Sequence, residues 1–183
     1  GYIKRMPAST YRSQRRGGRG VAALSTREED FVQNVFVTST HSPIMFFTNK
    51  GRAFRIKCYE IPEAGRTARG TAIVNLLQLA GDEKVTAIIP VPKDEASSYL
   101  LLATRRGVVK KTHLSEFSNI RKGGIIAQVL REGDELIGVA LTDGDRDVML
   151  ATRHGLAIRF SEKQVRPMGR ISQGVRGIDL MDE

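Results

Sequence analysis

Residues 99–113 read Tyr-Leu-Leu-Leu-Ala-Thr-Arg-Arg-Gly-Val-Val-Lys-Lys-Thr-His, and this segment indicates the architecture of the chain. A short apolar run leads into a polar turn that ends at Gly107, and a second run containing β-branched residues follows it. Two such runs around a glycine-containing turn predict a β-hairpin.

The same pattern returns along the chain. The Thr-x-x-Gly turn recurs at residues 48–51 and 152–155, and residues 1–5 align with residues 107–111 as a copy without its first strand. A second glycine follows each hairpin glycine at offsets of 19, 19, 17 and 19, in the pairs Gly1/Gly20, Gly51/Gly70, Gly107/Gly124 and Gly155/Gly174. A fixed period of this kind indicates a repeat architecture.

More strands are expected after each second glycine. Apolar runs occupy residues 21–24, 72–79, 125–130 and 175–180, acidic turns follow at 28–30, 81–83 and 133–135, and further strands are expected at 85–91 and 136–141. Four short strands per unit of about 50 residues predict an all-β, propeller-like array of four-stranded blades. We expect one partial domain over residues 1–183, with three and a half to four blades at about 1–40, 41–95, 96–145 and 146–183.

Composition excludes several classes of protein. With 40% hydrophobic and 27% charged residues, the chain is typical of a folded soluble domain. It contains no apolar run near the roughly 20 residues that cross a membrane, and no secretory apolar segment at its start. Cys58 is the single cysteine, which excludes an internal disulfide and favours a cytoplasmic location.

The charge indicates the partner. Lys and Arg number 29 against 20 Asp and Glu, for a net charge of +9 and a pI near 10.0. Such an excess favours a polyanion, most often nucleic acid, although a basic surface without a partner is the simpler alternative.

Cations recur at equivalent positions of the repeats. Four residues after the hairpin glycine stands Arg5, Arg55, Lys111 or Arg159, which predicts a curved row of charge on one rim. With neighbours, hairpin turns and the loops before the second glycines, the predicted perimeter comprises Lys4, Arg5, Arg12, Lys50, Arg52, Arg55, Arg66, Arg69, Arg105, Arg106, Lys110, Lys111, Arg121, Lys122, Arg153, Arg159 and Arg170. Such a row would bind phosphates without reading sequence. Lysines that protect exposed strand edges are the alternative explanation.

The densest cluster, called the box below, is Gln14-Arg15-Arg16-Gly17-Gly18-Arg19-Gly20. Arginine grips phosphate oxygens in a fork, and glycine removes the Cβ that would hold the backbone away. The box lacks the Gly-Lys-Ser/Thr ending of a nucleotide-phosphate loop.

The box resembles the seven-residue motif of the C-terminal domain of bacterial DNA gyrase A subunits, with Arg19 where lysine is common. Further similar segments lie at residues 11–13, 29–31, 39–41, 61–64, 68–70, 74–77, 133–137 and 174–178. The resemblance implies a six-bladed β-pinwheel whose blades exchange outer strands and wrap duplex DNA around a basic perimeter, for which the box is needed. It also implies membership of an ATP-dependent type IIA topoisomerase of composition A2B2, in which the A and B subunits are partners and negative supercoils are introduced.

Other functions are less consistent with the sequence. The equivalent domain of topoisomerase IV usually has a degraded box, and a propeller-like scaffold for protein partners remains an alternative. We expect the chain itself to be a monomer without a cofactor, and without enzymatic activity because no cluster of reactive residues converges. We also expect no metal site, because His41, His113 and His154 have no Cys or acidic partners at metal-binding spacing. Aromatic residues make up only 6%, which disfavours a single-strand binder.

Overall fold

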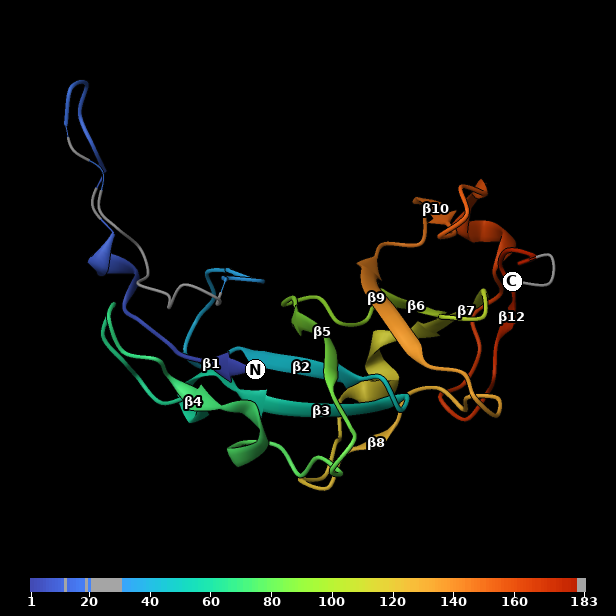
Figure 1. Cartoon of the computed structure of the whole chain (residues 1–183), viewed down its shortest axis with the longest axis horizontal. Coiled ribbons are helices and arrows are strands. Elements are labelled where there is room, and N and C mark those ends of the chain that lie inside the picture. Colours follow the sequence, from blue (N-terminus) through green and yellow to red (C-terminus); the bar gives the residue numbers. More distant parts are fainter. Residues whose placement is uncertain (12, 19, 21–30, 181–183) are drawn as a thin grey trace.

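The computed structural model describes residues 1–11, 13–18, 20 and 31–180, which form strands and short 3₁₀ turns without an α-helix among them (Figure 1). The strands are β1 (Tyr2–Ile3), β2 (Pro43–Thr48), β3 (Arg52–Lys57), β4 (Thr71–Ala72), β5 (Val85–Pro90), β6 (Tyr99–Thr104), β7 (Val108–His113), β8 (Ile125–Ile126), β9 (Leu136–Thr142), β10 (Asp147–Ala151), β11 (Ala157–Ser161) and β12 (Val175–Arg176). The 3₁₀ turns are η1 (Ala8–Thr10), η2 (Cys58–Glu60), η3 (Ile73–Asn75), η4 (Leu114–Phe117) and η5 (Glu162–Gln164).

The three predicted hairpins are confirmed as β2–β3, β6–β7 and β10–β11. Each turn is closed by the threonine of the Thr-x-x-Gly motif, whose hydroxyl accepts the amide hydrogen of the residue after the glycine. The distances are 3.3 Å for Thr48, 3.2 Å for Thr104 and 3.1 Å for Thr152. A threonine three residues before the hairpin glycine is therefore a local turn cap.

Each four-stranded sheet combines two repeats. The strand orders are β5-β2-β3-β8 and β12-β7-β6-β9, so that β8 and β12 come from the repeat after the one that forms the rest of the sheet. At the start of the chain, β1 pairs with β4 in the same way. The expected all-β, propeller-like array with exchanged outer strands is thus confirmed, and backbone hydrogen bonds join consecutive repeats.

The second glycines lie where one repeat meets the previous hairpin. Gly174 has a φ of +105°, and a Cβ on it would stand 2.4 Å from the carbonyl oxygen of Val109. Gly124 has a φ of +75°, and a Cβ there would stand 2.8 Å from the Phe54 ring. These positions require glycine because both its left-handed backbone and its missing side chain are used.

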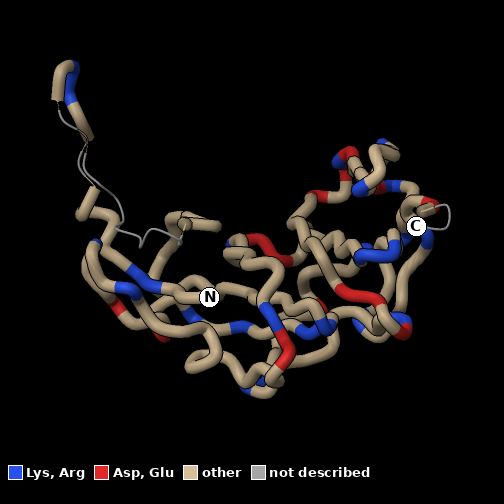
Figure 2. Tube along the Cα trace, viewed as in Figure 1, with Lys and Arg blue, Asp and Glu red and all other residues tan. Residues whose placement is uncertain are grey.

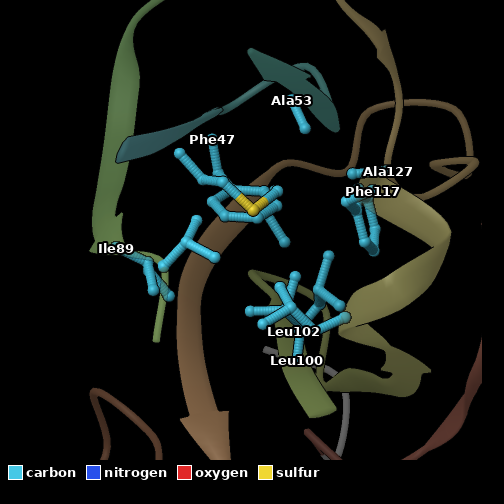
Figure 3. Close-up of a cluster of buried hydrophobic side chains, with 11 residues drawn as sticks. Phe47, Ala53, Ile89, Leu100, Leu102, Phe117 and Ala127 are labelled. Atoms are coloured by element: carbon cyan, nitrogen blue, oxygen red, sulfur yellow. The ribbon is translucent and has the colours of Figure 1, made fainter. Parts of the chain in front are cut away.

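Buried side chains cover both faces of the β5-β2-β3-β8 sheet. Met45 and Phe47 of β2 point into one cluster, and Ile44 and Phe46 point into the other. Figure 3 shows the first cluster, in which two consecutive repeats meet through Phe47, Ala53, Ile89, Leu100, Leu102, Phe117 and Ala127. A strand buried on both faces reads as a continuous apolar run, which explains the sequence of β2.

Some elements differ from the sequence predictions. The runs after the second glycines form strands of only two residues, β4, β8 and β12. Residues 31–39 carry no strand, because copy one of this chain has no counterpart of the hairpin strand with which β5 and β9 pair. The expected run at 21–24 and the acidic turn at 28–30 lie outside the described residues.

Candidate nucleic-acid interface

Three of the four aligned cations lie at contacts between repeats. Arg5, Arg55 and Lys111 each donate a hydrogen bond to a carbonyl oxygen of the following repeat, that of Ile61 (3.0 Å), Phe117 (3.3 Å) and Glu162 (2.8 Å), respectively. Their side chains are only 23%, 15% and 5% exposed. Their regular spacing therefore reflects a repeated contact between neighbours, which corrects the expectation of a continuous free row.

All three of these cations also pair with carboxylates, and Arg5 lies 3.4 Å from that of Glu63. Arg55 pairs with Glu95 at 2.7 Å, and its hydrogen bond lowers the pKa of that carboxyl group. Lys111 lies 3.8 Å from the buried Glu162 carboxylate. The fourth aligned cation, Arg159, pairs with Asp147 and has a side chain that is 75% exposed. Aligned cations thus differ in their exposure according to whether this chain supplies the next repeat.

Lys4 and Lys110, each three residues after a hairpin glycine, also point into the molecule. The Lys4 ammonium donates to three carbonyl oxygens, those of Gly65 (2.9 Å), Arg66 (2.8 Å) and Ala68 (2.8 Å). Lys110 is fully buried and donates to Gly169 (3.2 Å), Arg170 (2.6 Å), Ser172 (3.4 Å) and Ala127. The predicted place of Lys110 on the perimeter is wrong, because its ammonium is enclosed by carbonyl oxygens.

Burial lowers the pKa of Lys110 from 10.5 to about 8, with Glu116 opposing and Arg170 assisting the shift. Between these values the unfolded chain holds a proton that the folded chain lacks, so the free energy of unfolding should rise with pH. We expect the free energy of unfolding of the parent chain, minus that of Lys110→Met, to increase by up to about 1.4 kcal/mol per pH unit from pH 8 to about pH 10. Urea denaturation of parent and variant at each pH measures it. A difference that stays flat across this window, or falls, would contradict the assignment.

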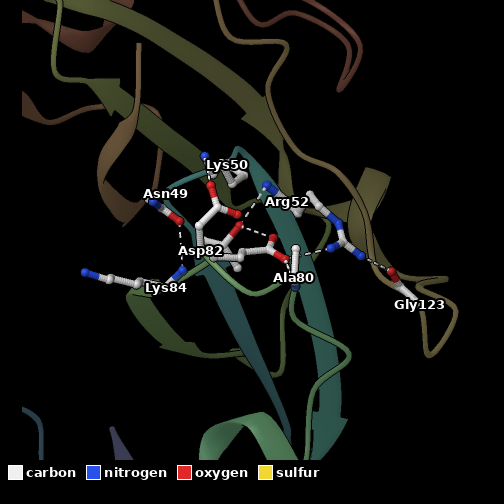
Figure 4. Close-up of polar contacts among 9 residues, drawn as sticks. Asn49, Lys50, Arg52, Ala80, Asp82, Lys84 and Gly123 are labelled. Carbon is white, nitrogen blue, oxygen red and sulfur yellow. Dashed lines mark hydrogen bonds and ion pairs between the residues drawn. The ribbon is translucent and has the colours of Figure 1, made fainter. Parts of the chain in front are cut away.

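Cations of the hairpin turns are neutralised by the acidic turns of the same repeat. Lys50 pairs with Asp82 at 2.6 Å, and Arg52 pairs with the buried Glu83 at 2.7 Å (Figure 4). Glu83 also accepts hydrogen bonds from Thr48 and from the amide of Ala80. Because the carboxylate is fully bonded in a buried setting, this contact stabilises the turn.

The next hairpin repeats this pairing in a looser form. Arg105 lies 3.9 Å from the Glu135 carboxylate, and Arg106 donates to the carbonyl oxygen of Glu132 at 3.1 Å. The third hairpin turn carries Arg153, which is exposed and forms no ion pair within the described part of the chain. Most hairpin-turn cations therefore have internal partners.

The second loops, defined as residues 61–70, 117–124 and 165–174, present a different set of cations. Arg66, Arg69, Arg121 and Lys122 are exposed and have no ion pair among the residues that the structure describes. Arg69 lies over the ring of Tyr2, with its guanidinium carbon 3.8 Å from the ring centroid. Arg170 is partly buried and donates to the carbonyl oxygen of Ile126 at 3.1 Å.

The box occupies the equivalent loop of copy one, since it ends at Gly20 as the second loops end at their own glycines. Its described residues are exposed and form a turn in which the Gly18 amide donates to Arg15 at 2.9 Å and Gly17 has a φ of +80°. In Figure 2 the described part of this loop carries basic residues and no acidic residue. Arg12 and Arg19 lie outside the described residues.

A second group of arginines recurs at fixed distances before the second glycines. Arg16, Arg66 and Arg170 each stand four residues before that glycine, and Arg19 and Arg69 stand one residue before it. The predicted cations of the box and of the second loops thus occupy equivalent loops. The cations at the fourth position after each hairpin glycine do not belong to these loops. Lys57 and Arg131 are exposed but were not in the predicted set, and neither stands at one of these recurring positions.

Other chemistry is not apparent in the described residues. They contain no group of three His, Cys, Asp or Glu side chains placed to hold a metal ion. None of the helical segments that the structure describes has the length and apolarity needed to span a membrane.

Together, fold and surface define a bladed β domain whose repeats share strands and whose basic loops gather at equivalent positions. The chain belongs to the family described as the DNA gyrase C-terminal domain, beta-propeller, whose profile matches residues 1–39, 42–92, 98–143 and 146–183.

Relatives agree with this assignment. The chain is 57% identical over 178 residues to the DNA gyrase A subunit of Halalkalibacterium halodurans, and 54% identical over 177 residues to that of Clostridium acetobutylicum. Each alignment covers 97% of this chain but 21% of the relative, so the chain spans about a fifth of these proteins.

Solved structures share the fold. A C-terminal domain of DNA topoisomerase IV matches with a TM-score of 0.85 and 28% identity over 100% of this chain and 55% of that one. A DNA gyrase A C-terminal domain matches with a TM-score of 0.70 and 26% identity over 98% of this chain and 57% of that one. The fold is thus common to both kinds of domain, while the two sequence relatives named above are gyrase A subunits.

Proposed function

We propose that this domain binds duplex DNA without reading its base sequence and wraps it along the edge formed by the box and the second loops. One observation carries the proposal: apart from the partly buried Arg170, the predicted cations described on these loops are exposed and without ion pairs among the described residues, whereas most hairpin-turn cations have an ion pair within the chain. An exposed cation without an ionic partner is available to a phosphate, whereas an ion-paired cation must first separate from its carboxylate.

The chemistry of the loops suits phosphate rather than bases. Arginine forms bidentate contacts with phosphate oxygens, and a turn built on Gly17 and Gly18 lets the backbone approach a nucleic-acid strand closely. Phosphate contacts set the path of a duplex but carry no sequence information. We therefore expect affinity to depend on salt and length rather than on sequence.

Wrapping follows from the placement of these loops in consecutive repeats. A duplex that meets several of them in turn must follow the line that they make. Bending 20–30 base pairs by 40–90° costs of order 1–6 kcal/mol, an amount that several phosphate contacts can offset. We infer that in the longer protein this wrap presents DNA to a gyrase of composition A2B2, for ATP-driven negative supercoiling in the bacterial cytoplasm.

A ligation-topology assay tests the proposal. The chain is bound to nicked plasmid, the nick is sealed, the protein is stripped and the linking number is read. We expect a shift of constant sign that grows with protein, and an affinity that falls on the order of a thousandfold between about 50 and 200 mM salt if about six phosphates are contacted. Binding without any shift would contradict wrapping, and a flat salt response would contradict phosphate recognition.

Two alternatives give different results in the same experiments. The structural likeness to a topoisomerase IV domain fits DNA binding with a weaker wrap, although the complete box favours the gyrase role. A scaffold for acidic proteins would bind such a partner and leave the duplex free.

A further inference from the structure

Three contacts between repeats can be compared at one position, the third residue after the hairpin glycine. This residue is Lys4 in the first contact, Phe54 in the second and Lys110 in the third. The two lysines point their ammonium groups at the second loop of the following repeat, and each donates to three carbonyl oxygens of that loop. A lysine ammonium has three hydrogens to donate, and the three loop oxygens use all of those of Lys4. Lys110 has a fourth acceptor, the carbonyl oxygen of Ala127 in its own repeat.

The carbonyl oxygens are equivalent in the two loops. They belong to the residues five, four and two positions before the second glycine, namely Gly65, Arg66 and Ala68 in one loop and Gly169, Arg170 and Ser172 in the other. Two contacts more than 100 residues apart in sequence thus share the same three acceptor positions. A chance approach of a long, flexible side chain would not repeat three partners.

The length of the loop varies with the residue that faces it. Both lysines face loops that close a glycine spacing of 19 residues. Phe54 instead faces the loop with the spacing of 17, and its ring lies where a Cβ on Gly124 would be. The shorter loop therefore packs against an apolar ring, while the longer loop is organised around an ammonium group.

The loop that Lys4 holds carries the same turn as the box. The Ala68 amide donates to Gly65 at 3.2 Å, and the equivalent Gly18 amide donates to Arg15 at 2.9 Å. Arg66 and Arg170, whose carbonyl oxygens the lysines hold, are equivalent to Arg16 of the box.

We propose that Lys4 and Lys110 are positioning residues, which hold the second loop of the next repeat in the shape that brings its arginines to DNA without touching DNA themselves. This inference rests on the proposed function. Without the ammonium group, three carbonyl oxygens of the loop lose their common donor, and the arginine beside them loses its fixed backbone. A lysine in this position then acts through the neighbouring loop rather than as part of the perimeter.

The test uses Lys4, which lies at the partly exposed first contact, in the full chain. Lys4→Met should lower the affinity for a duplex of 40 base pairs by about three- to tenfold, and Lys4→Arg should not restore it, because a planar guanidinium cannot converge on three oxygens. Lys93→Met, which removes an exposed lysine between repeats, is the matched charge control and should change affinity by less than twofold. Amide exchange at Ala68 should accelerate in Lys4→Met with the melting temperature little changed.

A double-mutant cycle separates positioning from direct contact. In a background with Arg66→Ala and Arg69→Ala, adding Lys4→Met should cause no further loss of affinity, because the groups that it positions are gone. An equal loss in both backgrounds, or recovery by Lys4→Arg, would overturn the inference in favour of direct phosphate contact. Failure of the parent chain to bind duplex DNA would overturn the proposed function itself, whereas normal binding by Lys4→Met would overturn this inference alone.

Discussion

Replacing Arg15, Arg16 and Arg19 by alanine is expected to remove the linking-number shift while duplex binding at low salt persists. The box supplies three cations, of which Arg15 and Arg16 lie in the described residues and are exposed, and the second loops retain theirs, so the duplex is still held. If all three contact phosphates, the slope of log affinity against log salt should fall by up to about 2.7. The ligation-topology assay and a salt titration measure the two effects separately.

A matched variant with the same change in charge controls this experiment. Arg105, Arg106 and Arg153 lie in hairpin turns, where Arg105 and Arg106 already have internal partners. Replacing these three by alanine should leave most of the linking-number shift. Equal loss of the shift in both triple variants would mean that net charge, and not the box loop, controls wrapping.

Gly174→Ala should produce the largest loss of stability among single substitutions considered for this chain. The residue has a φ of +105°, and the new Cβ would stand 2.4 Å from the carbonyl oxygen of Val109, a backbone atom that cannot turn away. The strain should force β12 from β7 and cost about 3 kcal/mol in the free energy of unfolding, which urea denaturation measures.

Gly65→Ala is the control, because a Cβ at Gly65 would meet nothing within 4 Å. We expect it to change the free energy of unfolding by less than about 0.5 kcal/mol. A similar loss in both variants would show that the contact at Gly174 is not the cause.

Hairpins, repeat length and fold class could be predicted from the sequence because they depend on neighbouring residues. Thr104, Gly107 and the apolar runs around them form one local unit, whose turn is closed by its own threonine. The repetition of this unit then indicates the array. The same locality explains why the box was recognisable as an exposed basic loop.

The role of each cation was less predictable. Arg5 and Arg159 occupy the same place in their repeats, yet one bonds to the following repeat and the other is exposed. The sequence position of Lys110 predicts a perimeter residue, but in the structure the carbonyl oxygens of Gly169 and Arg170 enclose its ammonium group. The alignment was correct, but the partners lie about 60 residues away.

Strands, turns and the repeated placement of glycine and basic residues were predictable from the sequence alone, since each depends on local backbone geometry and on the order of residues. The resemblance implied an exchange of outer strands. That β8 and β12 are the strands exchanged, and how exposed each cation is, became known only from the tertiary structure. Strand exchange brings the loop of one repeat against the hairpin of another, and no local pattern records that contact. Lys4 and Lys110 then donate hydrogen bonds to carbonyl oxygens within the molecule, while the side chains of Arg66 and Arg121 are exposed at the surface.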